Sequence, residues 1–295
     1  MVDEAESIHC AELQRLDSDR ASKMALSTPP VVLGSNVPPM FYWFKSHRRA
    51  ALRKAPLSPA ERSILEKNVP YATKLDGTDR AELEGLVRIF LAEKSFEGCG
   101  GLELTEEMRV TIAAQACVLL LHRETDIYPE VDAILVYPSP YRAPIKTNEG
   151  GVVIESEQER LGESWTRGVV VLAWDHVKSG AVRHADGHNV VLHEFAHQLD
   201  SEGGAMDGAP ELGARARYSS WAQVLGHEFA ELSRRLHEGR PTDIDAYGAT
   251  SPAEFFAVVT EMFFESPRKM KEHHSRLYEE LAAFYVQDPA SLNKL

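Results

Sequence analysis

The sequence contains few cysteines, and no two of them are close in sequence. Only three occur among 295 residues, at Cys10, Cys99 and Cys117. A disulfide-stapled scaffold or a zinc site made of thiolates needs several cysteines at short, regular spacings, so the sequence excludes both kinds of structure. Isolated cysteines of this kind are typical of proteins from a reducing compartment.

The sequence also lacks an apolar run long enough to span a bilayer. The longest such stretch, residues 110–121, contains Gln115, and a transmembrane helix needs about 20 predominantly apolar residues. The N-terminal segment, residues 1–20, is acidic and has no apolar stretch of the kind that marks a secretory signal. We therefore expect a cytoplasmic protein without a membrane partner.

An excess of positive charge is absent as well. Lysine and arginine number 32 against 45 aspartates and glutamates, which gives a formal net charge of −13. A chain of this charge repels the phosphates of nucleic acids, so we expect no direct binding to DNA or RNA. Binding to a protein that itself binds DNA is not excluded by this argument.

The order of hydrophobic patterns along the chain predicts an α+β fold. Helical periodicity over residues 57–121 gives way to short apolar runs over 131–174, and helical periodicity returns over 187–290. Residues 1–39 mix charges with proline-rich turns, so we expect a disordered extension to a domain formed by residues 40–295. The strands are expected at 133–137, 151–154 and 168–173, and a turn at 96–101.

The segment Asp186–Asp200 contains an HExxH pattern, in which His193 and His197 stand four residues apart. On a helix this spacing places both imidazoles on one face, one turn apart, where they can bind the same metal ion. Glu194 can then act as a general base on metal-bound water without being a ligand. We expect Asp186 to cap the helix. The same spacing also fits a pair of surface histidines on an amphipathic helix.

A catalytic zinc ion needs a third protein ligand from another element. Within residues 243–261, Glu254 and Glu261 lie two turns apart on one face of a predicted helix. Glu254 also fits a capping box with Ser251, so the spacing leaves the choice of ligand open. Tyr247, in the turn before this helix, could donate a hydrogen bond to a developing oxyanion, although a loop tyrosine can also serve packing alone.

Five stretches of the sequence, in the same order, resemble the family of Mlc titration factor A, a group of bacterial zinc peptidases. Together the resemblance covers roughly residues 41–290. The matching stretches are FLAEKSFEGCGGLELTEEMRVTIAAQACVLLL (90–121), ILVYPSPY (134–141), the region Trp165–Trp174, DGHNVVLHEFAHQLD (186–200) and YGATSPAEFFAVVTEMFF (247–264).

The resemblance implies a mainly helical, zincin-like metallopeptidase domain in which a small β-sheet precedes the HExxH helix. It also implies a gluzincin-type site, similar to that of the lethal factor catalytic domain, with one Zn²⁺ per chain. In that site His193, His197 and Glu254 would be metal ligands, Glu194 the catalytic base and Tyr247 the stabiliser of the transition state. Glu261 would orient a ligand histidine, and Asp200 would support the site or contact the end of its own helix.

The resemblance implies two functions. The first is an aminopeptidase-like peptidase that hydrolyses peptide substrates, and residues 168–173 are the expected sheet edge that holds the substrate as an added strand. The second is a regulatory protein that sequesters a DNA-binding transcriptional repressor, with catalysis secondary. No residue identifies the substrate, the preference for chain ends, or the oligomeric state.

Overall fold

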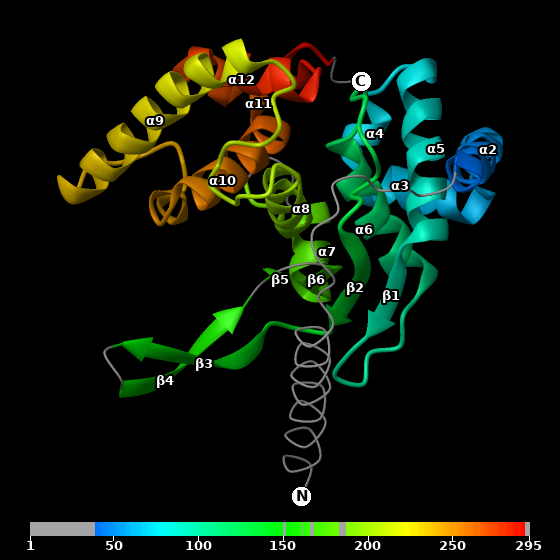
Figure 1. The fold of residues 1–295 in the computed structure, drawn as a ribbon, viewed down its shortest axis with the longest axis horizontal. Helices are drawn as coiled ribbons and strands as arrows, with labels where there is room; N and C mark the ends of the chain where they lie inside the picture. Colours follow the sequence, from blue (N-terminus) through cyan, green and yellow to red (C-terminus); the bar gives the residue numbers. More distant parts are fainter. Residues whose placement is uncertain (1–38, 150–151, 161, 166–167, 183–186, 293–295) are drawn as a thin grey trace, which may run out of the picture. The chain divides into compact units, whose positions relative to one another are not determined.

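The computed structural model describes residues 39–149, 152–160, 162–165, 168–182 and 187–292 (Figure 1). The chain divides into two compact units, Met1–Arg48 and Arg49–Leu295. The described residues of the smaller unit all belong to α2 (Pro39–Lys54), whose last residues are part of the larger unit. The predicted extension, residues 1–39, lies outside the described residues except for Pro39.

Four helices lie between α2 and the strand β2 in the described chain, and polar caps fix where the longer ones begin. A capping box opens the first of them, because Ser58 Oγ accepts a hydrogen bond from Glu61 N at 3.1 Å and the Glu61 carboxylate accepts one from Ser58 N at 2.7 Å. Asp76 and Thr105 accept backbone N–H groups in the same way at the next two long helices. The helices are α3 (Pro59–Asn68), α4 (Pro70–Thr73), α5 (Gly77–Glu93) and α6 (Glu106–Val118).

The core surrounds α6, as its nearly continuous apolar sequence predicts. Every residue from Val110 to Val118 is buried. An aromatic cluster beside it joins Phe90 of α5, Tyr128 and Phe195 of α8 (Val190–Ser201), with ring centroids 5.7 Å apart for Phe90–Phe195 and 4.7 Å for Tyr128–Phe195. This packing anchors α8, the helix with the HExxH pattern, to the first half of the chain.

The main sheet has the strand order β1-β2-β6-β5. β1, β2 and β6 run parallel, and β5 is antiparallel to β6. A separate antiparallel hairpin is formed by β3 and β4. The bounds are β1 (Ser95–Gly98), β2 (Val131–Tyr137), β3 (Tyr141–Glu149), β4 (Val152–Arg160), β5 (Gly162–Trp165) and β6 (Gly168–Ala173).

Two features of the sheet differ from the sequence prediction. The expected turn at 96–101 begins as strand β1, because Phe96 pairs with Ile134 of β2, and the turn itself comes at Gly100 and Gly101, where φ is positive. The expected substrate edge, 168–173, is β6, which pairs on both sides and is therefore not an edge. The strand at the edge beside it is β5.

The C-terminal half of the larger unit is helical, so the predicted α+β fold, mainly helical with a small sheet before the HExxH helix, is confirmed. No helix among the described residues is both long and apolar enough to cross a membrane. The remaining elements are α7 (Trp174–Val182), α9 (Arg215–His237), η1 (Ala246–Ala249), α10 (Pro252–Glu265), α11 (Pro267–His273), α12 (Ser275–Tyr285) and η2 (Pro289–Ser291).

Candidate metal centre

The helix α8 begins at a polar cap that differs from the one predicted. Asn189 is the N-cap residue, and its Oδ1 accepts a hydrogen bond from Leu192 N at 3.1 Å. The predicted cap, Asp186, lies outside the described residues. Asparagine directly before an apolar run is itself a strong N-cap signal, so the sequence did contain the information.

The second element of the site, α10, begins at Ser251. Its hydroxyl accepts a hydrogen bond from Glu254 N at 3.2 Å, so Glu254 occupies the third helical position, as the capping-box pattern predicts. Its carboxylate contacts two histidines of α8. The helix cap therefore positions Glu254 by its backbone and leaves its side chain available to α8.

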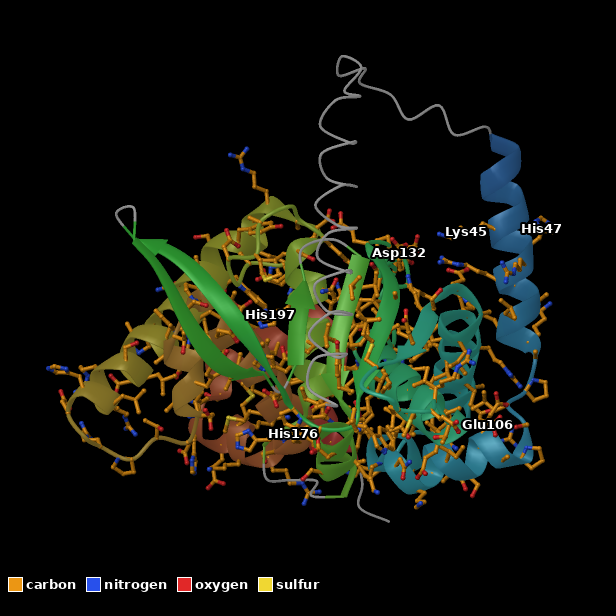
Figure 2. All side chains as sticks on the ribbon, turned by 90° about the horizontal axis from the view of Figure 1, so that it is seen from below. Lys45, His47, Glu106, Asp132, His176 and His197 are labelled. Atoms are coloured by element: carbon orange, nitrogen blue, oxygen red, sulfur yellow. The ribbon has the colours of Figure 1, made fainter. Side chains whose placement is uncertain are left out.

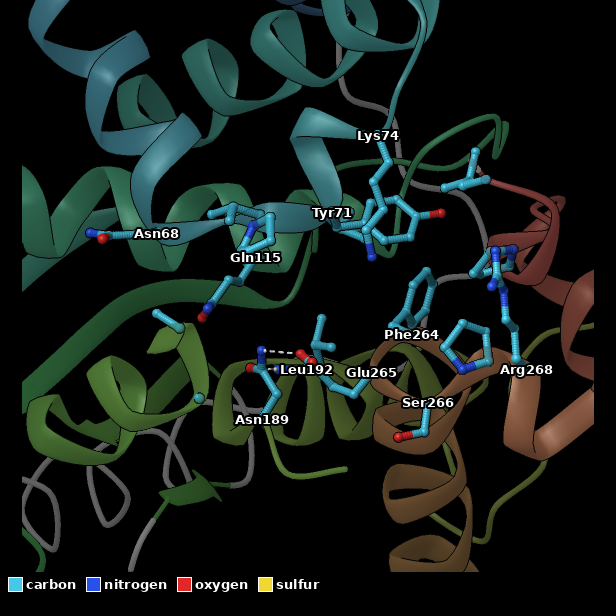
Figure 3. A pocket seen from close by; sticks show the side chains of 18 of the residues that line it. Asn68, Tyr71, Lys74, Gln115, Asn189, Leu192, Phe264, Glu265, Ser266 and Arg268 are labelled. Atoms are coloured by element: carbon cyan, nitrogen blue, oxygen red, sulfur yellow. Dashed lines mark hydrogen bonds between the residues drawn. The ribbon is translucent and has the colours of Figure 1, made fainter. Parts of the chain in front are cut away.

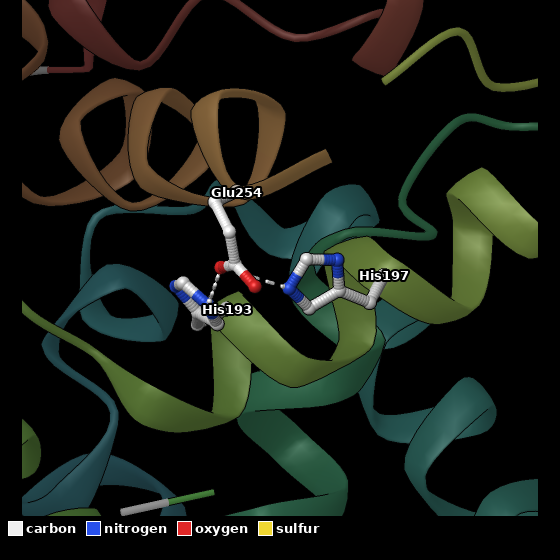
Figure 4. A group of neighbouring side chains, drawn as sticks. All are labelled: His193, His197 and Glu254. Atoms are coloured by element: carbon white, nitrogen blue, oxygen red, sulfur yellow. Dashed lines mark hydrogen bonds and ion pairs between the residues drawn. The ribbon is translucent and has the colours of Figure 1, made fainter. Parts of the chain in front are cut away.

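Three side chains from these two helices converge on one point (Figure 4). Glu254 Oε2 lies 3.0 Å from His193 Nε2 and 3.3 Å from His197 Nε2. Two imidazole nitrogens and one carboxylate oxygen within 4.8 Å of one another form a donor set that suits zinc. The residues present therefore fit the metal ion that the resemblance implies.

The histidines are not a surface pair. The His193 side chain is 13% exposed and the His197 side chain 6%, and Figure 2 shows His197 inside the larger unit while the exposed Glu106 lies near its outside. Their rings lie 4.9 Å apart, centroid to centroid. The amphipathic-helix alternative therefore does not describe this helix.

Glu261 contacts the outer nitrogen of one histidine. Its Oε1 lies 2.8 Å from His193 Nδ1, and its Oε2 accepts a short hydrogen bond from Asn189 N. A proton on Nδ1 that is donated to Glu261 leaves Nε2, the nitrogen facing Glu254, as the atom that can bind a metal ion. Glu261 thus connects the cap of α8 to the imidazole that this helix presents.

His197 has a different environment. Its Nδ1 is buried and has no hydrogen-bond partner among the described residues. Asp200, which is fully buried, accepts a hydrogen bond from Gly208 N at 2.8 Å through Oδ2, while its Oδ1 likewise has no partner within the described chain. Among the described residues, Asp200 is therefore not joined to His197 by a hydrogen bond.

Three carboxylates determine the electrostatics of the centre. Burial raises the pKa of Glu194 to about 7, an effect that nearby His193 opposes and the charges of Glu254 and Glu261 reinforce. Burial alone would also raise the pKa of Glu254, but its hydrogen bonds with the two histidines lower it to about 2. For His193, burial acts to lower the pKa, and the bonds to Glu254 and Glu261 outweigh it and raise the pKa well above its usual value. A centre this rich in carboxylate favours a bound cation.

Tyr247 lies in η1, just before α10. Its ring centroid is 6.0 Å from that of His193, and the residue is 52% exposed. The Asp245 carboxylate accepts a hydrogen bond from Tyr247 N at 2.7 Å, which fixes the turn. The structure thus brings Tyr247 to the solvent side of the centre, close to the histidine nearer the start of α8.

Comparison with known proteins agrees with this geometry. The family model described as "Glucose-regulated metallo-peptidase M90" matches residues 43–286. An uncharacterized protein from Synechocystis sp. is 43% identical over 82% of this chain and 89% of its own length. Two proteins named Mlc titration factor A are each 31% identical to this chain. The one from Serratia proteamaculans covers 77% of this chain and 87% of its own length. The one from Klebsiella pneumoniae covers 75% of this chain and 84% of its own length. The resemblance seen in the sequence is confirmed, and the chain belongs to the glucose-regulated metallo-peptidase M90 family.

Proposed function

We propose that this protein is a zinc-dependent, aminopeptidase-like peptidase of the cytoplasm. The observation that supports it best is the convergence of His193, His197 and Glu254 from two helices, beside the buried Glu194. Membership of a metallo-peptidase family gives the same reaction class independently. The proposed substrates are peptides, and one zinc ion per chain is the proposed cofactor.

The proposed ligands are held by their surroundings before any metal binds. Glu261 fixes the ring of His193 through Nδ1, and Ser251 fixes the backbone of Glu254. A zinc ion in this site would supply a Lewis acid that polarises the peptide carbonyl and makes water more acidic. Preorganised ligands of this kind lower the cost of ordering the site on binding.

Glu194 is the proposed general base and acid. Its carboxylate is buried, and burial raises its pKa to about 7, close to neutrality. A group of that pKa can take a proton from the attacking water and return it to the departing amine, because both protonation states are accessible at neutral pH. Tyr247, next to His193, is the proposed donor to the oxyanion that forms on the substrate.

The edge strand β5 is the proposed place where the peptide backbone binds. β5 pairs with β6 on one side, stands at the end of the strand order and packs against α8, the helix that carries His193 and His197. A peptide that added to this edge would place its backbone next to the HExxH helix.

The relatives from Serratia and Klebsiella favour a second candidate function. Their name, Mlc titration factor A, describes proteins that titrate Mlc. We propose on this ground that the present chain also sequesters a regulatory protein, namely a DNA-binding repressor, independently of catalysis. A pull-down with the Glu194→Gln variant as bait should capture the same repressor as the wild type; loss of capture in this variant alone would contradict that independence.

The metal content of the purified protein tests the main proposal. Elemental analysis of wild type should give about one zinc per chain, with most of it lost in Glu254→Ala and most retained in Glu261→Ala. Release of the N-terminal residue from a panel of short peptides then tests the aminopeptidase assignment. Absence of zinc from protein purified without chelators, together with no uptake on titration, would refute the peptidase proposal.

A further inference from the structure

A cavity that is separate from the candidate metal centre lies beside the start of α8 (Figure 3). It has a volume of about 370 Å³ and lies between α4, α6, α7, α8 and the junction of α10 with α11. None of the three proposed metal ligands is among its described lining residues. This volume is at the lower end of the range found for small-molecule sites, roughly 300–1,000 Å³.

One wall of the cavity presents a buried hydrogen-bond acceptor. Gln115 of α6 is 4% exposed, and its Oε1 has no hydrogen-bond partner among the described residues. Figure 3 shows its amide extending from α6 toward the side of the cavity where Asn189 lies. Because a buried carbonyl without a donor is costly, the cavity has a place for a ligand atom that donates a hydrogen bond.

A carboxylate lies on the same side. Glu265 lines the cavity, and its Oε1 accepts a hydrogen bond from Asn189 Nδ2 at 3.0 Å. Together Gln115 and Glu265 offer oxygen acceptors, one neutral and one charged. This combination selects a positively charged donor such as an ammonium group over a hydroxyl.

The opposite side of the cavity carries positive charge. Lys74 and Arg268 both line the cavity. Within the described chain, neither side chain lies within ion-pair distance of a carboxylate. The neighbouring Lys269, by contrast, forms an ion pair with Asp243 at 2.9 Å. In a protein with a net charge of −13, two cations without an ion-pair partner at one cavity favour an anionic group of a ligand.

The wall between the two ends is apolar. Tyr71 and Phe264 meet edge to face there, with ring centroids 5.5 Å apart, and Leu192 lines the same cavity. An aliphatic side chain of a ligand would be buried against these groups.

We propose that this cavity binds a small zwitterion with an apolar side chain, either a free amino acid or a dipeptide. Its ammonium group is held by Gln115 and Glu265, and its carboxylate by Lys74 and Arg268. The site is separate from the metal centre, so its occupation can be measured whether or not the protein hydrolyses peptides. The cavity lies beside Asn189, whose backbone N–H donates a hydrogen bond to Glu261. A bound ligand would therefore lie close to Glu261, the carboxylate that contacts His193 Nδ1.

Calorimetric titration of the full-length protein tests this site with L-leucine and glycyl-L-leucine as separate ligands. Saturable binding of one of them with a Kd of about 1 mM or tighter is expected for ligands of this size. N-acetyl-leucine, which lacks the ammonium, and leucine amide, which lacks the carboxylate, should each bind at least about tenfold more weakly.

Four variants locate the binding. Gln115→Met keeps the size of the side chain and removes the acceptor, so the affinity should fall about tenfold or more. Lys74→Ala should also weaken binding, whereas Arg276→Ala, which removes an exposed charge away from the cavity, should not. Glu254→Ala separates the two sites, because loss of a proposed metal ligand should leave this affinity unchanged.

Three results would overturn the proposal. The first is no binding of either zwitterion at about 10 mM to protein shown to be folded by circular dichroism. The second is binding that Glu254→Ala abolishes and Gln115→Met leaves intact, which would assign it to the metal centre. The third is equally tight binding of N-acetyl-leucine, which would make the ligand a simple anion.

Discussion

Two groups of histidine and carboxylate among the described residues have ligand atoms close enough to share a metal ion, yet they differ in burial and in the surroundings of their imidazoles. One is His193, His197 and Glu254, and the other is Asp79, Glu82 and His122. The side chains of the first are 6–22% exposed and those of the second 27–38%. The ligand atoms are therefore close together in both groups, but only the side chains of the first group are largely buried.

The chemistry around the imidazoles also differs. At His122 a single ring lies between Val286 O, 3.1 Å from Nδ1, and Asp79 Oδ1, 2.8 Å from Nε2. Because both neighbours are acceptors, this ring is satisfied when each nitrogen carries a proton. At the candidate centre His193 likewise lies between two acceptors, Glu261 at Nδ1 and Glu254 at Nε2. The difference is that a second imidazole, that of His197, faces the same Glu254 oxygen, so one divalent cation could bind both Nε2 atoms. The comparison teaches that short distances alone do not distinguish the two groups, and that a second imidazole and burial set the first apart as the candidate zinc site.

The largest expected effect comes from removing one imidazole from each group. His197→Ala should reduce bound zinc from about one per chain to near zero and abolish peptidase activity, because two remaining ligands hold zinc poorly. His122→Asn should leave both unchanged; asparagine tolerates the left-handed backbone at this position, where φ is 63°. Elemental analysis and a peptide hydrolysis assay measure both, and zinc loss in His122→Asn would remove the distinction between the groups.

The next effect separates catalysis from metal binding within the buried centre. Glu194→Gln should lower kcat by about 10²–10⁴-fold, the usual contribution of a general base, and should keep zinc at the wild-type level. The amide keeps the size of the side chain but cannot take up the proton. Retained turnover in zinc-loaded variant protein would exclude Glu194 as the base.

A smaller effect is expected from Glu261, the carboxylate that contacts Nδ1 of His193. Glu261→Gln should weaken zinc binding about 10–100-fold, because the amide no longer holds the His193 Nδ1 proton with a full charge. Competition with a chelator of known affinity measures the change. Asp79→Asn is the matched control, since it alters the equivalent contact at His122; an equal loss of zinc affinity in both variants would contradict the role of Glu261.

The sequence predicted the parts of this centre that depend on local spacing. The HExxH spacing placed His193 and His197 on one helix face, and the Ser251 pattern located the start of α10. The spacing left open which of Glu254 and Glu261 is the third ligand. The family resemblance favoured Glu254, whose carboxylate contacts both histidines in the structure. Helical periodicity and caps are local properties, and such features can be read from a single sequence.

Features that depend on distant pairing were predicted less well. β1 was expected to be a turn, because its glycine-rich surroundings hide a strand whose partner, β2, comes much later in the chain. β6 was expected to be an edge strand, and only the pairing with β5 places it inside the sheet. Strand order is set by contacts between segments far apart in sequence, for which one sequence carries little signal.

The smallest expected effect is a pH dependence of stability at the exposed group. Burial lowers the pKa of His122, but its bonds to Asp79 and Val286 outweigh this and raise the pKa above the ordinary value of 6.5. A raised pKa in the folded state means that His122 stabilises the protein below about pH 6.5 and loses this contribution as the pH rises through the folded-state pKa. Since the pair is partly solvent-exposed, the contribution should be only about 0.5 kcal/mol. Urea unfolding should therefore show wild type more stable than His122→Asn at about pH 5.5, with the difference reduced at about pH 8.5. A difference that grew with pH would contradict a raised pKa of His122 in the folded protein.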